Sequence, residues 1–278
     1  MTKLETPTFI PEFFELPKFA HEQILGDSFH EIKEWLKNEQ HCYLEKNTPL
    51  ENYKCKNYKC KESEDIKGFD VPVLIKSRNG QNKGLMIIVG ESPLRNGTEN
   101  GLLVGFPFAV DYKNEPPQCA VYKKLFNELL KDYDLYITDI IKVWSKSKSK
   151  NLKVTKDDND VLNLELGTLS NMYDNKIHIL LMGNNAQKWK IKYEESLIRK
   201  ITEIKIPHMS QQNWHTWRIK KYEDTFRRLI KENKITEEDI EDLLVKDTNE
   251  LEFCSMKADT VANTAFEMIS SELEKKIK

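Results

Sequence analysis

The sequence predicts an α/β protein in which a central, mostly parallel sheet of four to five strands is flanked by helices. Short apolar runs rich in valine and isoleucine alternate with amphipathic stretches from residue 71 onward. Most of these runs are continuous rather than alternating in polarity, which is typical of strands buried on both faces. A chain of 278 residues, 39% of them hydrophobic, can also bury a sizeable core.

Five apolar runs are the predicted strands, and amphipathic stretches are the predicted helices. The strands are expected at 71–76, 85–89, 135–141, 177–182 and 203–207. Helices are expected at 120–131, 217–232 and 258–276, where apolar residues recur with helical spacing. Because strand and helix alternate, the sheet should be mostly parallel, and a ligand should bind beyond the carboxyl ends of its strands.

The chain divides into three predicted parts. Residues 1–80 form an N-terminal elaboration with one clear helix signal, a capping box made by Ser28 and Glu31. Residues 81–232 form the α/β core, and residues 233–278 form a C-terminal helical extension.

The composition excludes several classes of protein. No apolar run approaches the roughly 18 residues that a membrane span needs, and no secretory signal is visible. We therefore expect a cytoplasmic protein without a membrane partner; no oligomeric state is predicted. The five cysteines are an odd number without a paired Cys-x-x-Cys, which favours reduced thiols and no bound metal.

Residues that could take part in catalysis or ligand binding follow four of the predicted strands. Glu91 and Ser92 follow the strand 85–89, and Asp139 lies near the end of the strand 135–141. A Gly-Asn-Asn turn begins at Gly183, and His208 follows the last strand. In a parallel sheet these positions meet at one rim.

Taken in order, these segments resemble motifs of the uracil-DNA glycosylase superfamily over about residues 84–230. Leu85-Met-Ile-Ile-Val-Gly-Glu-Ser-Pro93 is similar to the strand and Gly-x-x-Pro turn of the first motif. Gly105-Phe-Pro-Phe-Ala-Val110 is similar to the segment with the base-stacking aromatic residue, and Tyr136-Ile-Thr-Asp-Ile-Ile-Lys-Val143 to the base-reading strand. Ile179-Leu-Leu-Met-Gly-Asn-Asn-Ala-Gln187 and His208-x-Ser210 resemble the last strand-turn-helix and the His-Pro-Ser motif.

The resemblance implies a DNA glycosylase that needs no cofactor and acts on DNA with a flipped pyrimidine nucleotide. Glu91 would orient water and offset positive charge on the deoxyribose, and His208 would donate to the base O2 as negative charge develops there. Phe108 would stack on the flipped base. Ser92 and Ser210 complete the expected substrate-binding set.

Two departures from the superfamily pattern bear on the substrate and the activity. Asp139 stands where uracil-specific members present asparagine, and an acceptor there favours the N4 amine of cytosine or a modified cytosine over uracil. An ionised Asp139 would repel the leaving base, so we expect a protonated carboxyl. Ser92 stands where the best-known members carry the acid, which leaves a catalytically inactive DNA-binding or interaction protein as the alternative.

DNA contacts are expected from two further segments. Lys146, Lys148 and Lys150 alternate with serines and are suited to phosphates, whereas a solvated loop is the structural alternative. Gln212 or Trp214 stands where the superfamily places its wedge into the base stack. Lysines are concentrated in 146–153 and 54–61, and acidic residues in 237–250. The formal charge of -2 is therefore the sum of unevenly distributed charges.

Each candidate residue also has a purely structural interpretation. Glu91 could lie near a helix N-terminus, His208 could bond a backbone carbonyl, and Asp139 could cap a loop. Phe106 competes with Phe108 for the stacking role. A hydrolase of free nucleosides is a third class of function, and the biological setting is either base excision repair or defence against phage DNA with modified bases.

Overall fold

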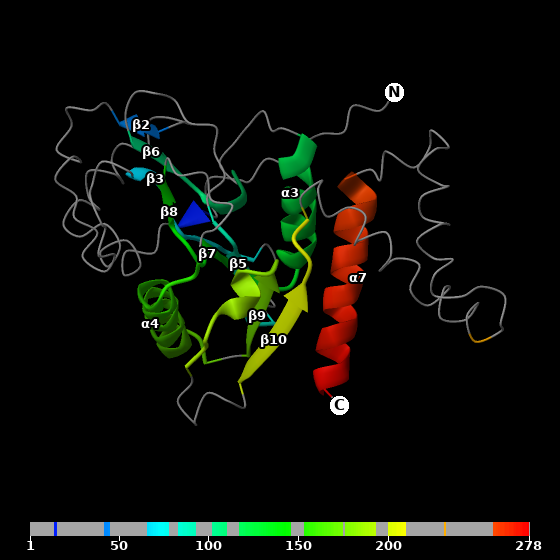
Figure 1. The fold of residues 1–278 in the computed structure, drawn as a ribbon. Coiled ribbons are helices and arrows are strands. Elements are labelled where there is room, and N and C mark those ends of the chain that lie inside the picture. The colour runs from blue at the N-terminus through cyan, green and yellow to red at the C-terminus, as the bar shows by residue number, and fades with distance from the viewer. Residues whose placement is uncertain are drawn as a thin grey trace.

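The computed structural model describes residues 14–15, 42–44, 66–77, 83–92, 102–109, 117–145, 153–174, 176–192, 200–209, 231 and 258–277. A six-stranded sheet forms the centre of this part of the chain (Figure 1). Its order is β1 (Phe14–Glu15), β4 (Val73–Ile75), β7 (Asp134–Asp139), β5 (Leu85–Gly90), β9 (Ile177–Met182) and β10 (Ile201–Ile206).

The main sheet is mixed. Strands β7, β5, β9 and β10 run parallel to their neighbours in that group. Strand β4 is antiparallel to β7, and β1 is antiparallel to β4. The predicted α/β class is therefore confirmed, and each of the five predicted strands is present, but the sheet has an antiparallel side and one strand more than predicted.

A second sheet of four short strands was not predicted. Its order is β2 (Cys42–Leu44), β6 (Leu102–Gly105), β3 (Ile66–Asp70) and β8 (Val143–Ser145). Only β3 and β6 are parallel, and the pairing of β3 with β8 shifts register between Ile66 and Gly68. Strands from within the first 80 residues thus join both sheets.

Helices cover the two faces of the main sheet. Helices α3 (Pro117–Leu129) and α7 (Ala258–Ile277) lie on one side, and α4 (Lys156–Met172) lies on the other (Figure 1). Because successive residues of a strand point to opposite faces, Met86 and Ile88 pack with α3 and α7, whereas Ile87 and Val89 pack with α4.

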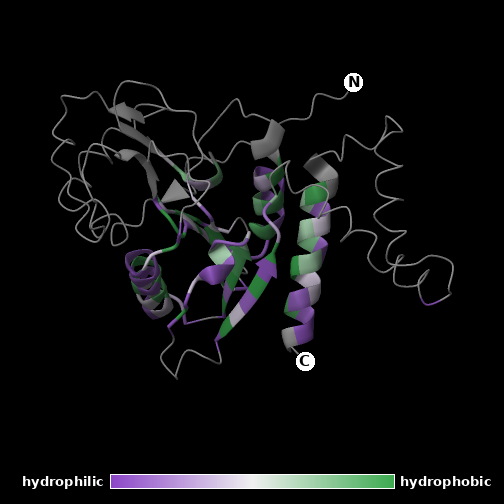
Figure 2. Cartoon of the chain, viewed as in Figure 1, coloured by the Kyte–Doolittle hydropathy of each residue, from purple (hydrophilic) through white to green (hydrophobic). Residues whose placement is uncertain are grey.

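The burial of the strands explains their continuous apolar sequence. Every residue of β5, β7 and β9 is buried. In Figure 2 the central strands are largely hydrophobic, while α7 is hydrophobic over most of its length and hydrophilic near its C-terminal end. Within the described residues, no helix combines the length and the apolar character that crossing a membrane requires.

The helix predictions had three outcomes. The predicted helices at 120–131 and 258–276 correspond to α3 and α7. The signal at Ser28 lies outside the described residues, as does the helix predicted at 217–232 except for Lys231, which is helical. Helix α4 was not predicted, although Thr155 and Asp158 form a complete capping box at its start.

Candidate active site

The carboxyl ends of four neighbouring parallel strands form one rim of the main sheet. Strand β5 ends at Gly90 and leads into Glu91, and β7 ends at Asp139. Gly183 follows β9, and His208 lies two residues beyond β10. The strand order β7-β5-β9-β10 therefore gathers the predicted acid, the predicted base reader and the predicted histidine at one edge.

The turn after β9 holds the Glu91 carboxylate. The backbone N–H of Asn185 donates to Glu91 Oε1 at 3.0 Å. Gly183 has φ +91°, and a Cβ added there would lie 2.6 Å from the same oxygen. Glycine is thus required at this position both for its backbone conformation and for the close approach of the carboxylate.

Asp139 and Phe108 converge on Gly90. Gly90 pairs with Asp139 across the parallel strands β5 and β7. A Cβ added to Gly90 would collide with Asp139 Oδ1 and would lie 2.7 Å from Phe108 Cζ. Asp139 is buried, with 4% of its surface exposed. A small residue before Glu91 is what allows these two side chains to meet at the rim.

Phe108 is held in an unusual backbone conformation. It lies in the short helix η4 (Pro107–Ala109) with φ 58°, the one positive φ among the described non-glycine residues. For a residue with a Cβ, this left-handed backbone conformation is less stable than the right-handed one by about 1–2 kcal/mol. Its half-buried ring lies 4.6 Å from the ring of Tyr122, whereas Phe106 is buried in the core. Of the two competing aromatic residues, Phe108 is the one at the rim.

His208 contacts Tyr122 of helix α3. The Tyr122 hydroxyl lies 3.2 Å from His208 Nδ1 and 3.4 Å from Nε2. Burial lowers the pKa of His208 from 6.5, and the nearby negative charge of Glu91 opposes that effect. A pKa below 6.5 favours the neutral imidazole near pH 7.

Tyr122 was missed in the sequence as a site residue. Its spacing with Val121, Leu125 and Phe126 identified it as part of the apolar stripe of a helix. Its ring does pack there, but its hydroxyl reaches His208, 86 residues away in the chain. The available signal was the hydroxyl itself, since a buried tyrosine usually bonds a partner.

A buried charged cluster lies beneath the rim, on the side of α4. Lys142 is fully buried, and its Nζ donates to the backbone carbonyl of Asp139 at 2.8 Å and to Thr138 Oγ1. It also forms an ion pair with Glu165 Oε1 of α4 at 3.1 Å. Burial raises the pKa of Glu165, and Lys142 opposes that shift. This cluster anchors the end of β7 that carries Asp139.

The remaining predicted residues are only partly described. Ser92 is half-buried beside Glu91. The others lie outside the described residues: Ser210, Gln212, Trp214, Lys146, Lys148 and Lys150. Among the described residues, no three histidine, cysteine, aspartate or glutamate side chains are grouped as metal ligands would be.

Comparison with known proteins gives no independent assignment of this site. No protein-family model matches the chain, and no curated protein matches its sequence.

Proposed function

We propose that this protein is a DNA glycosylase that hydrolyses the bond between a flipped pyrimidine and its deoxyribose and leaves an abasic site. The observation that carries the proposal is the meeting of Glu91, His208, Phe108 and Asp139 at one rim of parallel strands. The proposed substrate is a cytosine-type or modified cytosine base, with uracil as the alternative base.

The carboxylate and the imidazole each stabilise one of the two opposite charges that bond cleavage creates. Glu91 offsets the positive charge on the sugar and orients the attacking water. Neutral His208 donates a hydrogen bond to the base O2, where negative charge develops. The contact between Tyr122 and His208 supports this role because a hydroxyl bonded to one ring nitrogen orients the imidazole and sets its tautomer.

Phe108 and Asp139 bind the flipped base in this proposal. Stacking on an aromatic ring is worth about 1–3 kcal/mol and offsets part of the cost of flipping. Asp139 reads the exocyclic group of the base as an acceptor, which favours the N4 amine of cytosine over the O4 of uracil. The convergence of both side chains on Gly90 supports a shared base pocket.

The test is strand breakage after alkali treatment. Oligonucleotides with a single uracil, cytosine or modified cytosine are incubated with the protein, and hot alkali converts each abasic site into a nick. We expect a nick with at least one of these bases, none with Glu91→Gln, and a shift of preference toward uracil with Asp139→Asn.

Two results would argue against parts of the proposal. DNA binding without a nick across the whole base panel would favour the inactive DNA-binding protein, for which Ser92 at the usual acid position is the supporting observation. An unchanged base preference in Asp139→Asn would remove Asp139 as the selector while leaving the glycosylase activity intact.

A further inference from the structure

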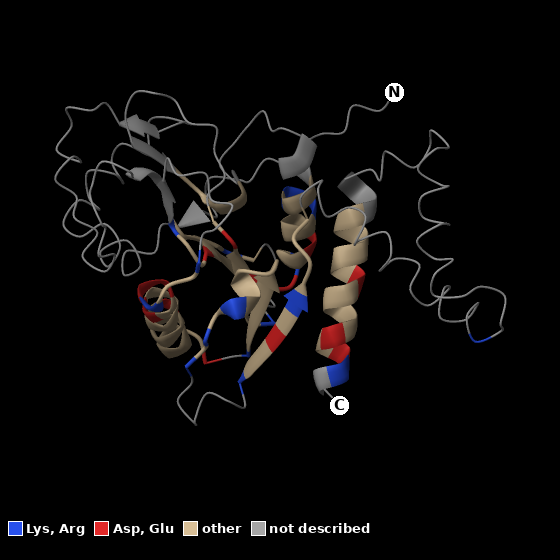
Figure 3. Cartoon of the chain, viewed as in Figure 1, with Lys and Arg blue, Asp and Glu red and all other residues tan. Residues whose placement is uncertain are grey.

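An extended segment that leaves the rim carries three exposed lysines. It begins at Lys188, the last residue of the short helix η5 (Ala186–Lys188), and continues to Lys192, and its residues alternate in burial. Trp189 is buried and Ile191 packs partly against the core, whereas Lys188, Lys190 and Lys192 are exposed. In Figure 3 the basic positions alternate with uncharged ones along this stretch. We call these three residues the lysine track.

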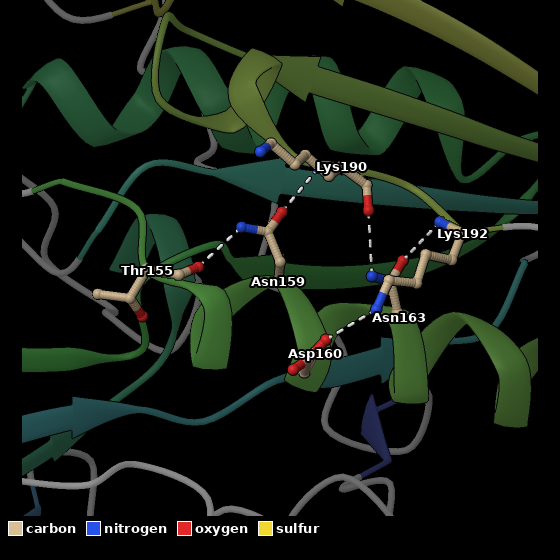
Figure 4. Close-up of polar contacts among 6 residues, drawn as sticks. All are labelled: Thr155, Asn159, Asp160, Asn163, Lys190 and Lys192. Carbon is tan, nitrogen blue, oxygen red and sulfur yellow. Dashed lines mark hydrogen bonds and ion pairs between the residues drawn. The ribbon is translucent and has the colours of Figure 1, made fainter.

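Two asparagines of helix α4 hold the backbone of the lysine track. Asn159 Oδ1 accepts from the N–H of Lys190 at 2.7 Å, and Asn163 Nδ2 donates to the carbonyl of Lys190 at 3.1 Å. Asn163 Oδ1 also accepts from the N–H of Lys192 at 2.9 Å (Figure 4). The asparagines are one helical turn apart, so they bond the extended chain as a neighbouring strand would.

Asn159 is itself held in place. Its Nδ2 donates to the carbonyl of Thr155, the residue that caps α4, at 2.8 Å. In Figure 4 the Lys190 side chain extends away from α4, while its backbone faces the two asparagines. The track therefore presents its charges from a fixed backbone rather than from a free loop.

The lysine track begins at the turn that holds Glu91. Lys188 Nζ donates to Asn185 Oδ1 at 2.9 Å, and the backbone N–H of Asn185 is the donor to Glu91. A cation bound to this turn thus stands next to the candidate catalytic carboxylate.

We propose that the lysine track binds the phosphate backbone of the DNA strand that enters the active site. This inference rests on the proposed function. The four backbone steps from Lys188 to Lys192 span at most roughly 13 Å, which matches about four nucleotides of one strand. Each lysine is a point charge suited to a phosphate, and three lysines on a backbone held by α4 can neutralise neighbouring phosphates of one strand.

Asp160 reduces the positive charge of the lysine track. Its carboxylate pairs with Lys192 Nζ at 3.1 Å, and both side chains are exposed, at 44% and 68%. Such exposed ion pairs contribute about 0–1 kcal/mol to stability, so a phosphate can replace the carboxylate as the partner of Lys192. Removing the carboxylate should therefore tighten DNA binding rather than weaken it.

The test is the salt dependence of DNA binding, measured by fluorescence anisotropy with a labelled oligonucleotide of unmodified bases. The variant K188Q/K190Q/K192Q is compared with K83Q/K131Q/K275Q, which removes three exposed lysines from other elements. The track variant should lower the slope of log affinity against log salt by about 2–3 and weaken binding at low salt by about tenfold or more. The control should leave the slope unchanged.

Three results would overturn the lysine track as the DNA-binding surface. The first is an equal effect of the two triple variants, since that would reflect net charge alone. The second is an affinity that Asp160→Asn leaves unchanged or lowers. The third is a labelled polyglutamate peptide that binds through the track while the oligonucleotide does not.

The binding assay is independent of catalysis, so the two proposals can fail separately. If the wild-type protein binds DNA through the track but no base is released from any substrate, the glycosylase activity fails and the track stands. If bases are released while the track variant keeps the wild-type salt slope, the track fails and the activity stands.

Discussion

Replacing Gly183 with alanine tests whether the turn after β9 positions the Glu91 carboxylate. The new Cβ would lie 2.6 Å from Glu91 Oε1, and ordinary contact begins at 3.4 Å, so the carboxylate must retreat by about 0.8 Å. Displacing a reacting group by about 1 Å can cost about 100-fold in rate. We therefore expect base release to slow by about 10-fold to 100-fold.

The same substitution also strains the backbone, and this effect needs its own control. Gly183 has φ +91°, where a residue with a Cβ loses about 1–2 kcal/mol. Gly84 has φ +140°, lies at the opposite end of the sheet before β5, and a Cβ added there would also collide with the backbone oxygen of Lys176. Gly84→Ala should lower the free energy of unfolding without slowing base release at a temperature where the variant is folded.

A second control substitutes alanine for glycine where no strain arises. Gly167 lies inside α4 with no atom within 4 Å of the position of a new Cβ. Gly167→Ala should raise the free energy of unfolding by about 0.5–1 kcal/mol and leave base release unchanged.

The assay is single-turnover base release with alkali cleavage, together with urea unfolding of each variant. A folded Gly183→Ala protein that keeps the wild-type rate would refute the argument that this turn fixes Glu91. Equal losses of rate in the Gly183 and Gly84 variants would refute it as well, because strain alone would then explain the effect.

Three further predictions concern other groups. Lys142→Met should lower the free energy of unfolding by about 3–5 kcal/mol in urea because it leaves Glu165 buried without its cation. The double variant K142M/E165L should recover most of that loss. A single variant as stable as the wild type would contradict this prediction. Tyr122→Phe should slow base release severalfold with little change in stability, since only the hydroxyl that contacts His208 is removed; an unchanged rate would exclude that role. Burial lowers the pKa of His178 from 6.5 to about 4, so the unfolded chain takes up a proton that the folded protein excludes. Stability should therefore fall as the pH drops from 6.5 to 4, by up to about 3 kcal/mol, and His178→Phe should remove this part of the pH dependence in urea unfolding.

The central strands of the main sheet were predictable because they are long and buried on both faces. Strands β5, β7 and β9 have six residues each, and their apolar sequence needs no partner to be recognised. The second sheet contains strands of three to five residues with mixed polarity, such as Ile66–Asp70, which are stabilised by pairing rather than by a local pattern. Pairing between distant segments has no signal in a single sequence.

Helix α4 was missed because its first turns are polar. Asp157, Asp158, Asn159 and Asp160 give the start of this helix no apolar residues at helical spacing. In the structure the Asp158 carboxylate accepts from the backbone N–H of the N-cap Thr155, and Asn159 bonds the lysine track. The polar residues are there to make specific contacts, and hydrophobic periodicity does not detect such residues.

The candidate site was predictable where its residues follow strands, and not where they contact the site from elsewhere. Glu91, Asp139 and His208 lie at strand ends, so the topology brings them to one rim. Tyr122 and Lys142 take part through contacts that depend on how helices pack against the sheet. The pattern of Tyr122 predicts only core packing, which the structure confirms for its ring, and nothing in the sequence near Lys142 indicates a buried ion pair.

The bonds between α4 and the lysine track also bear on aggregation. An extended chain with unpaired N–H and C=O groups is a template on which a strand of another molecule can pair. At Lys190 both backbone groups are occupied by asparagine side chains, and the N–H of Lys192 is occupied as well. A helix therefore closes a segment that would otherwise be open to intermolecular sheet formation, and substitutions at Asn159 or Asn163 would reopen it.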